Sequence, residues 1–335
     1  MRELRNSYLS IFGWGVFLAS ALSLGSCSSD ETIDAIQGEA ISFGNAFVEN
    51  STRATDPSYG AAKALEQFNV WGTVTGNTTG NTVNIFNGAT VTKGDAAYGA
   101  AWTCDQTQYW IPDATYNFMA IAHGTVTSKD EYNMPLTISY TADGSTDLLL
   151  GELSSNGIKT VKTDGSATPT TGVIGNEKVV DFTMSHLLSK VVFTFNNNDK
   201  ETALKVKDIK LTGTSSSGTY TIATGQWSDT NTGYELGFGN EVTIAKDSNG
   251  TSELERLIIP GTYNLGISFK VNDEEGFGDE QVITYPEEGK TFSATFVAGQ
   301  SYNITANIKS GMKEIIFNVT SAAWGGNVNN DIDIN

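Results

Sequence analysis

The sequence is poor in the residues that build metal sites and in positive charge. Its 335 residues include two histidines and two cysteines, too few for a zinc site of the Cys/His type. The formal net charge is −18, so electrostatic repulsion is expected from nucleic acids and from anionic lipid surfaces. We therefore predict no metal site and no nucleic acid partner.

The sequence also lacks the common catalytic motifs. It contains no G-x-S-x-G, no phosphate-binding loop, no H-E-x-x-H and no dinucleotide fingerprint. Ser185 and His186 do not make a catalytic pair, because neighbouring residues on a strand point to opposite faces. His123 is isolated, and His186 is predicted as a structural hydrogen-bonding residue at a strand start. We predict a protein that is not an enzyme and needs no cofactor.

Two sequence features can each be interpreted in two ways. The acidic stretch 272–281 does not match an EF-hand loop, so a solvated hairpin loop is predicted for residues 273–280, with a calcium site as the alternative. Stacking on sugar rings is the alternative to a core position for four tryptophans, Trp71, Trp102, Trp110 and Trp227.

One apolar run stands near the start of the chain. It covers residues 11–25 and follows Arg2 and Arg5. Its length, about 15 residues, is short of the roughly 20 that span a bilayer, and it is typical of a secretory signal peptide. The sequence LGSC that ends at Cys27 resembles a bacterial lipobox, in which the peptide is cut between Ser26 and Cys27 and the cysteine is acylated. An uncleaved anchor helix with an incidental cysteine is the alternative.

This interpretation divides the start of the chain into two segments. Residues 1–26 are a lipoprotein signal peptide, and residues 27–37 are a polar tether that begins with the acylated Cys27. Cys104 then has no disulfide partner. Because Trp102 and Cys104 share a face of a predicted strand, a buried, inert thiol is expected, with a reactive thiol as the alternative.

From Gly38 onward, short β-rich runs recur between glycine and asparagine turns. Alternation predicts that Tyr302, Ile304, Ala306 and Ile308 share one face of a strand. Residues 58–68 are the one candidate for an amphipathic helix. Strands are predicted over residues 68–75, 82–92, 116–124, 135–142, 179–196, 204–213, 218–227, 256–261, 263–272, 281–286, 290–296, 300–309 and 313–324. The pattern predicts an all-β protein built as an antiparallel β-sandwich.

A Gly-, Ser- and Thr-rich stretch, residues 154–177, is predicted as a domain boundary. It separates an N-terminal β-sandwich domain, residues 38–175, from a C-terminal β-sandwich domain, residues 177–335.

An ordered set of motifs resembles the fimbrillin-like family of lipoproteins, also called type V pilins. The most specific is DFTMSHLLSKVVFTF, residues 181–195. The other motifs are ISFGNAFVENSTRA (41–54), YWIPDATYNFMAIA (109–122), TDLLLG (146–151), IIPGTY, FVAGQSYNITANI and a last strand that ends at Trp324.

The resemblance implies two transthyretin-like β-sandwich domains in tandem after a lipoprotein signal peptide. It also implies that an arginine-specific protease cuts after Arg53, before Ala54, and releases a first strand that contains Ile41, Phe43 and Phe47. A strand from another subunit would then fill the groove, and a pilus would grow. A permanent first strand beside a solvated Arg53 is the alternative.

The resulting hypothesis is a structural or adhesive pilus subunit, exported as an outer-membrane, surface-exposed lipoprotein and present in the fimbrium once assembled. Its expected partners are other pilin subunits, bound by strand exchange, and the membrane that holds its lipid anchor. The polar C-terminal tail after Trp324 is a candidate donor strand, with a frayed end as the alternative. The alternative function is a non-polymerising surface lipoprotein that binds a glycan or a host protein.

Overall fold

The computed structural model describes residues 40–48, 65–76, 80–94, 102–111, 114–152, 159–161, 167–169, 179–228, 230–252, 254–275, 279–287, 292–312, 314–323 and 330–332. All of these ranges belong to one compact unit, Gln37–Asn335. The predicted signal peptide and tether lie outside the described residues, as do Ser26 and Cys27. No helix in the described ranges is long and apolar enough to cross a membrane.

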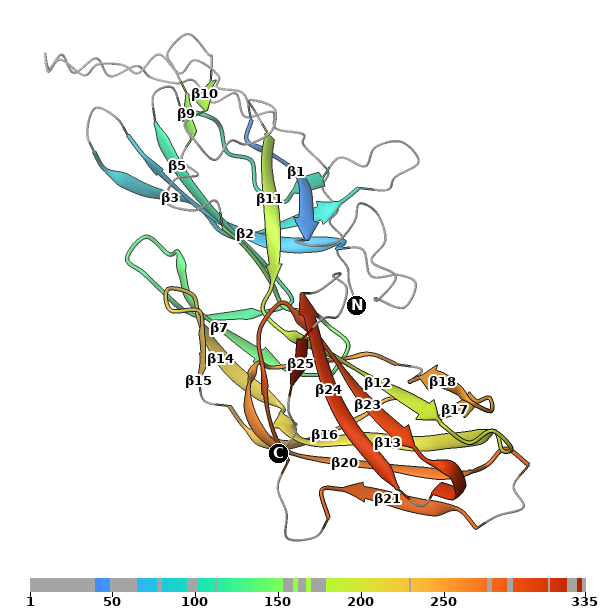
Figure 1. The fold of residues 1–335 in the computed structure, drawn as a ribbon. Coiled ribbons are helices and arrows are strands. Elements are labelled where there is room, and N and C mark those ends of the chain that lie inside the picture. Colours follow the sequence, from blue (N-terminus) through green and yellow to red (C-terminus); the bar gives the residue numbers. More distant parts are fainter. Residues whose placement is uncertain are drawn as a thin grey trace, which may run out of the picture. The chain divides into compact units, whose positions relative to one another are not determined.

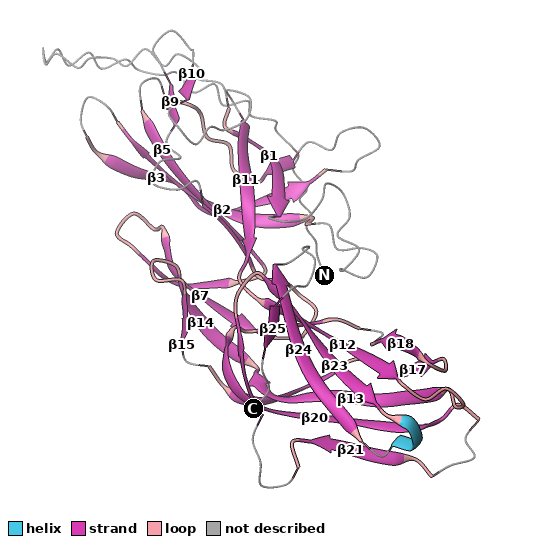
Figure 2. Cartoon of the chain, in the orientation of Figure 1, coloured by secondary structure: helices cyan, strands magenta, loops and turns pink. Residues whose placement is uncertain are grey.

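The described residues are mostly strands joined by turns, as Figure 2 shows. The one helical element among them is a 3-10 turn, η1 (Ser310–Met312). The all-β prediction is confirmed.

The described strands form four hydrogen-bonded sheets (Figure 1). The nine-stranded sheet has the order β1 (Ser42–Val48), β11 (Val179–His186), β8 (Leu149–Glu152), β5 (Thr115–Ala122), β2 (Gln67–Thr75), β3 (Thr82–Lys93) and β4 (Trp102–Cys104), with β9 (Lys159–Val161) beside β5 and β10 (Ala167–Pro169) beside β9. The four-stranded sheet has the order β15 (Gln226–Ser228), β14 (Ser217–Thr221), β7 (Pro135–Thr141) and β6 (Thr125–Lys129).

Two six-stranded sheets follow in the C-terminal half. One has the order β18 (Ser248–Thr251), β12 (Ser189–Asn197), β23 (Gln300–Ile308), β24 (Ile315–Ala323) and β25 (Asn330–Ile332), with β19 (Arg256–Ile258) also beside β12. The other has the order β16 (Thr232–Gly237), β13 (Leu204–Ser215), β20 (Gly261–Asp273) and β21 (Gln281–Tyr285), with β17 (Glu241–Ile244) beside β13 and β22 (Phe292–Phe296) beside β20.

Alternation of apolar and polar residues accounts for the strand faces. On β23 the four residues predicted to share a face are all buried, whereas Asn303, Thr305 and Asn307 between them are only partly buried. Such a period of two presents one apolar face to a core and one polar face to solvent.

Four sequence expectations differ from the structure. The predicted strand 179–196 breaks at Leu187 and Leu188, because Leu187 N–H donates to Leu148 O while the next residues join another sheet. The predicted strand 218–227 is a hairpin, whose turn is closed by Gly225 in the left-handed region at φ 65°.

The third difference concerns the start of β2: Gln67 and Phe68 of the candidate helix belong to that strand, and residues 58–64 lie outside the described residues. The fourth is that two strand pairs, β1 with β11 and β12 with β23, run parallel within sheets predicted to be antiparallel. Both pairs join segments more than a hundred residues apart, which leaves the long crossover that parallel pairing requires.

Three apolar clusters form the core. One lies within the nine-stranded sheet around Phe68, Phe118 and Phe182, and one lies between the two six-stranded sheets. The third joins Ile138 of β7 and Tyr220 of β14 to Trp71 of β2 and Ile121 of β5, so it lies between the four-stranded and the nine-stranded sheets. The four-stranded sheet takes one hairpin from each side of the predicted 175/177 boundary, and the pairing of the large sheet continues through β11. The division into two tandem domains stays a prediction.

Candidate functional site: the first strand and its seam

In the N-terminal half, strand β1 lies between β11 and the segment after β4. We call this junction the seam. On one side β1 pairs with β11, where Ser42 lies opposite Val179 and Val48 opposite Met184. On the other side the chain just before β1 meets the segment after β4: Ile41 N–H donates to Gln108 O at 2.8 Å. Figure 1 shows β1 (blue) beside β11 (yellow-green). The first strand and the residue before it therefore contact the two ends of the strand order β11–β8–β5–β2–β3–β4.

The side chains at the start of this strand enter the core. Phe43 is 3% exposed, and its ring stacks on Phe182 with the centroids 6.2 Å apart. It also makes edge contacts with Phe68, Phe86 and Phe118, with centroid distances from 5.5 to 6.4 Å. Burial of a phenylalanine side chain contributes about 1.5–3 kcal/mol, and such aromatic pairs add to it.

Gly44 lets β1 approach β11 closely. A Cβ atom at this position would overlap the Asp181 carboxylate and would lie 2.6 Å from Val179 Cγ1. The register between the two strands also shifts between Phe43 and Ala46. The pairing is therefore close but irregular, and a side chain at position 44 requires the Asp181 and Val179 side chains to shift.

On the other side of the seam, the segment after β4 is held by the packing of Trp110 against Tyr116, which we call an aromatic corner. Trp110 is buried, and its ring meets the Tyr116 ring edge-on at 4.7 Å. The Tyr116 hydroxyl accepts a hydrogen bond from Ile111 N–H at 2.5 Å and donates to Tyr109 O at 3.4 Å. Burial raises the pKa of this hydroxyl to about 12, so it stays protonated in neutral solution. The corner fixes the segment that contacts Ile41.

The predicted strand residues have different outcomes. Ile41 and Phe43 are buried, as expected for side chains that fill a groove. For Phe47 the structure gives the backbone position, opposite Thr183 of β11. Arg53 and Ala54 lie outside the described residues, so cleavage between them stays a prediction.

A buried polar pair lies at the far end of β11, and sequence reasoning did not connect its members. His186 Nδ1 lies 2.5 Å from Asp147 Oδ2, and the two side chains are each 3% exposed. The other histidine, His123, is hydrogen-bonded through Nδ1 to the backbone oxygen of the same Asp147 at 2.8 Å. The predicted hydrogen-bonding role of His186 is confirmed, although it ends a strand instead of starting one. The TDLLLG motif carried the missing signal, since its aspartate is the shared partner.

The tryptophans belong to the core. Trp71 and Trp110 are buried, and Trp102 and Trp227 are partly buried against the apolar clusters. The alternative of exposed rings that stack on sugars is not supported at these positions. Cys104 shares the inward face of β4 with Trp102, and burial raises the pKa of its thiol, which lowers the fraction of reactive thiolate.

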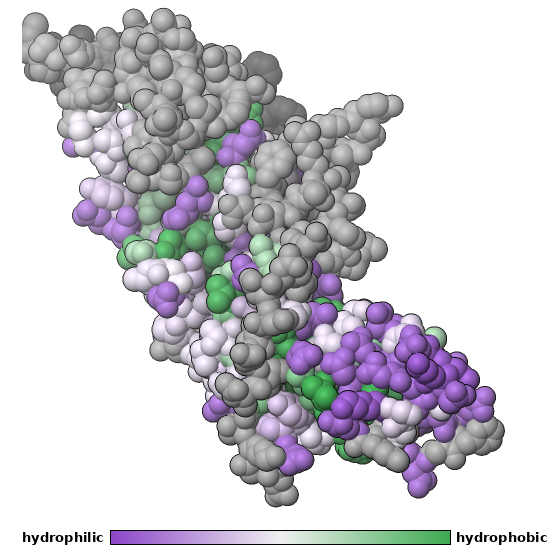
Figure 3. Space-filling view, viewed as in Figure 1, coloured by the Kyte–Doolittle hydropathy of each residue, from purple (hydrophilic) through white to green (hydrophobic). Residues whose placement is uncertain are grey.

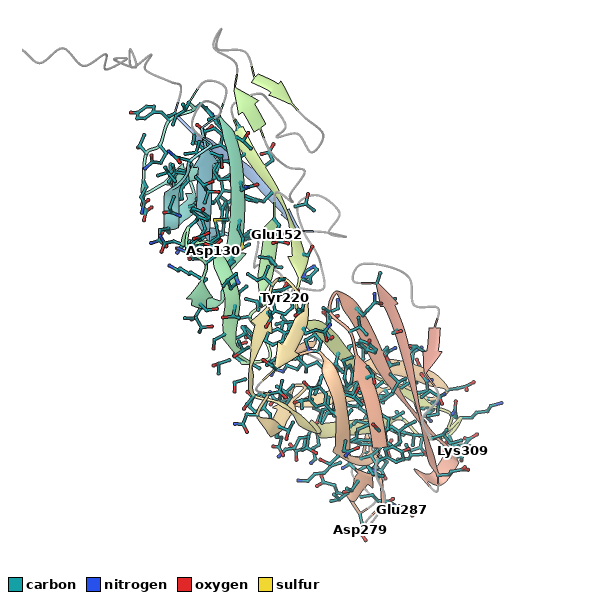
Figure 4. All side chains as sticks on the ribbon, turned by 90° about the vertical axis from the view of Figure 1, so that its left-hand side faces the viewer. Asp130, Glu152, Tyr220, Asp279, Glu287 and Lys309 are labelled. Carbon is teal, nitrogen blue, oxygen red and sulfur yellow. The ribbon has the colours of Figure 1, made fainter. Side chains whose placement is uncertain are left out.

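The acidic stretch 272–281 connects the antiparallel strands β20 and β21, as the hairpin prediction requires. The Glu280 carboxylate contacts Lys207 and lies 3.5 Å from Lys270 Nζ, so it is neutralised within the sheet. Figure 4 labels Asp279 in the same connection. Within the described ranges, no group of three or more His, Cys, Asp or Glu residues is arranged to hold a metal ion.

Comparison with protein families gives a match over most of the chain. The model of the fimbrillin-like family matches residues 52–324. This chain belongs to the fimbrillin-like family. A search of curated proteins found no match.

This fimbrillin-like chain is also similar to solved structures. It is similar to a fimbrial protein from Bacteroides vulgatus, with 16% identity, a TM-score of 0.55, and coverage of 85% of this chain and 99% of that chain. It is also similar to a candidate cell adhesion protein from Bacteroides uniformis, with 18% identity, a TM-score of 0.48, and coverage of 85% and 98%. At these identities the first likeness shows a shared fold.

Proposed function

We propose that the chain is a fimbrial subunit, structural or adhesive, that assembles on the cell surface by strand exchange. In this proposal β1 is a removable strand, cut free after Arg53, and a strand from another subunit takes its place. Membership of the fimbrillin-like family and the fold shared with a fimbrial protein support the surface role. Neither family nor fold calls for an enzymatic activity or a cofactor.

The position of Phe43 carries the proposal. Loss of β1 would open the cluster around Phe43 and leave β11 without its partner on one side. An exposed apolar groove beside an unpaired strand binds a further strand through main-chain hydrogen bonds and side-chain pockets. A strand of another subunit would then make the contacts that β1 makes now and gain a similar binding free energy.

The arginine content favours one productive cut. The chain has four arginines, of which Arg2 and Arg5 lie in the predicted signal peptide. Of the other two, Arg256 opens β19, which pairs with β12, and its Nε donates to Gly237 O at 2.6 Å. Cleavage there requires β19 to leave its sheet first, because a protease needs an extended, unpaired backbone. Arg53 lies five residues beyond the end of β1.

The test uses the mature chain, residues 27–335, without lipid, treated with an arginine-specific protease. We expect release of a peptide that ends at Arg53, by mass spectrometry, and then a ladder of oligomers in size-exclusion chromatography. Arg53→Lys is the matched control, since it keeps the positive charge and removes the site. It should stay uncut and monomeric. A clean cut at Arg53 without association, or no cut, would overturn the polymerising function and favour a capture protein.

The lipid anchor is a separate part of the proposal. Acylation of Cys27 would hold the uncut chain at the outer membrane, and a cut after Arg53 would separate the body from that anchor. Metabolic labelling with a fatty acid analogue, with Cys27→Ser as the control, tests it. Incorporation that is equal in both proteins would contradict lipidation at this residue.

The C-terminal tail offers a donor in this scheme. Its strand β25 pairs with Val319, Thr320 and Ser321 of β24 in the same chain, through only three residue pairs. A short pairing of this kind opens at little cost. Deletion of residues 325–335 should leave the cut at Arg53 intact and abolish the ladder. An unchanged ladder would exclude the tail as the donor.

A further inference from the structure

Strand β11 is held by different partners along its length. Its first half, Val179–Thr183, pairs with β1, and its last three residues, Met184–His186, pair with β8. Within β11, Met184 pairs with both neighbouring strands, with Val48 of β1 and with Gly151 of β8. The proposed departure of β1 would therefore remove the described pairing of Val179–Thr183, and β11 must still keep its place as a wall of the groove.

The last residue of β11, His186, is held by a group of polar contacts centred on Asp147. Ala122 of β5, Leu149 of β8 and His186 lie side by side in register at this end of the sheet. Asp147 joins all three strands there: its side chain binds His186, its backbone oxygen binds His123, and it stands two residues before β8. Figure 4 labels Glu152, which marks the other end of β8.

The loop that carries Asp147 is itself rigid. The Asp143 carboxylate accepts hydrogen bonds from Ser145 N–H and Thr146 N–H, both at 2.7 Å. Tyr140 donates its hydroxyl hydrogen to Thr146 O. Gly144 O accepts from Leu257 N–H at 3.0 Å, which ties the loop to the strand β19. These hydrogen bonds hold the loop in place and thereby fix the position of Asp147 beside His186.

The inward face of β11 shows why a polar residue is needed there. Val180, Phe182 and Met184 are buried in a row, and His186 takes the fourth inward place. An apolar residue at this place would bury the strand end but would not fix its position along the strand direction. A hydrogen bond to Asp147 does, because its geometry is directional.

We propose that Asp147 and His186 are positioning residues for strand exchange: they hold β11 by its C-terminal end, so that the groove keeps its shape while β1 is absent. The inference rests on the proposed function. In the uncut chain β1 supports the same strand, so the pair matters most after cleavage.

The test compares His186→Leu with His186→Asn in the full mature chain, cut after Arg53. Asn places an amide N–H where Nδ1 lies, whereas Leu removes the donor. A synthetic peptide of residues 38–50 is the probe, and its binding is measured by fluorescence anisotropy. We expect at least about tenfold weaker binding for Leu and less than about threefold for Asn. Hydrogen exchange after cleavage should be faster for residues 184–186, which pair with β8, in His186→Leu than in His186→Asn.

The outcomes separate the two proposals. Unsubstituted protein that is not cut, or that binds no peptide after the cut, overturns the proposed function and this inference with it. Unsubstituted protein and His186→Leu that bind the peptide equally, with equal protection of residues 184–186, overturn this inference alone. If His186→Leu does not fold before the cut, Asp147→Asn gives the same decision, because it keeps the size of the side chain and weakens the bond. Unchanged binding there would also overturn the inference.

Discussion

Each half of the molecule contains an aromatic corner, and the strands beside the two corners are paired differently. In the N-terminal half, Trp110 packs against Tyr116 at 4.7 Å, and the Tyr116 hydroxyl accepts from the backbone N–H five residues earlier. In the C-terminal half, Phe296 packs against Tyr302 at 4.8 Å, and the Tyr302 hydroxyl accepts from Val297 N–H at 2.9 Å.

The match between the corners extends to solvent exposure. Ile111 and Val297 follow the first aromatic residue and are 49% and 53% exposed. The segments 110–116 and 296–302 thus share an aromatic residue, an exposed aliphatic residue and a tyrosine six positions after the first. Burial raises the pKa of both tyrosine hydroxyls. The repeat gives each half the same turn into a central strand.

The strands beside these corners differ in how firmly they are paired. In the C-terminal half, β23 pairs with β12 from Ser301 to Ile308 and with β24 from Gln300 to Ile308, without a break in register. In the N-terminal half, β1 pairs with β11 through an irregular register. A strand that is regularly paired on both sides resists loss, whereas a short strand with an irregular register opens more readily. The comparison favours the N-terminal half as the place of the proposed exchange.

The largest effect is expected for Phe43→Ala, which should lower the free energy of unfolding of the uncut chain by about 3–5 kcal/mol through the cavity it leaves. Phe193→Ala, in the C-terminal core, is the matched control with a similar loss. After cleavage and assembly, the loss should persist for Phe193→Ala and disappear for Phe43→Ala, because β1 has left. Urea unfolding before and after the cut measures both. A loss that persists for Phe43→Ala would mean that β1 stays.

A medium effect is expected for Gly44→Ala. The added methyl group meets Asp181 and Val179 of β11, and overpacking of this kind costs about 1–3 kcal/mol. Gly237→Ala on β16 is the control, since a Cβ there has no neighbour within 4 Å. Thermal unfolding should show a lower Tm for the first variant only. Equal Tm values would show that the seam is looser than the close approach of Gly44 indicates.

The corners should respond alike in stability. Tyr116→Phe and Tyr302→Phe each leave a backbone N–H without its acceptor, at a cost of about 1–3 kcal/mol. Only Tyr116→Phe should also weaken binding of the 38–50 peptide, since only that corner holds a wall of the seam. Equal binding of the peptide by both variants would contradict the proposal that only the N-terminal corner supports the groove.

The smallest effect is expected at an exposed ion pair of the C-terminal half, a region in which Figure 3 shows many hydrophilic side chains. Lys210 Nζ lies 2.7 Å from Glu235 Oε1, and both side chains are about half exposed. Lys210→Ala should cost less than about 1 kcal/mol, because water and salt screen such pairs. The loss should shrink further in 1 M NaCl. A larger loss that salt does not change would indicate a packing role for this lysine.

The sequence by itself determined the all-β class and most of the strands. Period-two alternation is a local property, so it places residues such as Ile304 and Ile308 on the buried face without knowledge of their neighbours. The burial of Ile41 and Phe43 was predictable in the same way, whereas the groove-filling role proposed for them comes from family resemblance.

Only the tertiary structure decided which strands pair and which polar residues meet. The contact of Asp147 with two histidines and the parallel pairing of β1 with β11 both join positions far apart in the chain. Non-local contacts depend on how the whole chain closes, and local preference carries no information about that closure. The strand break at Leu187 shows the same limit: its residues favour a strand throughout, and the chain nevertheless changes sheets there.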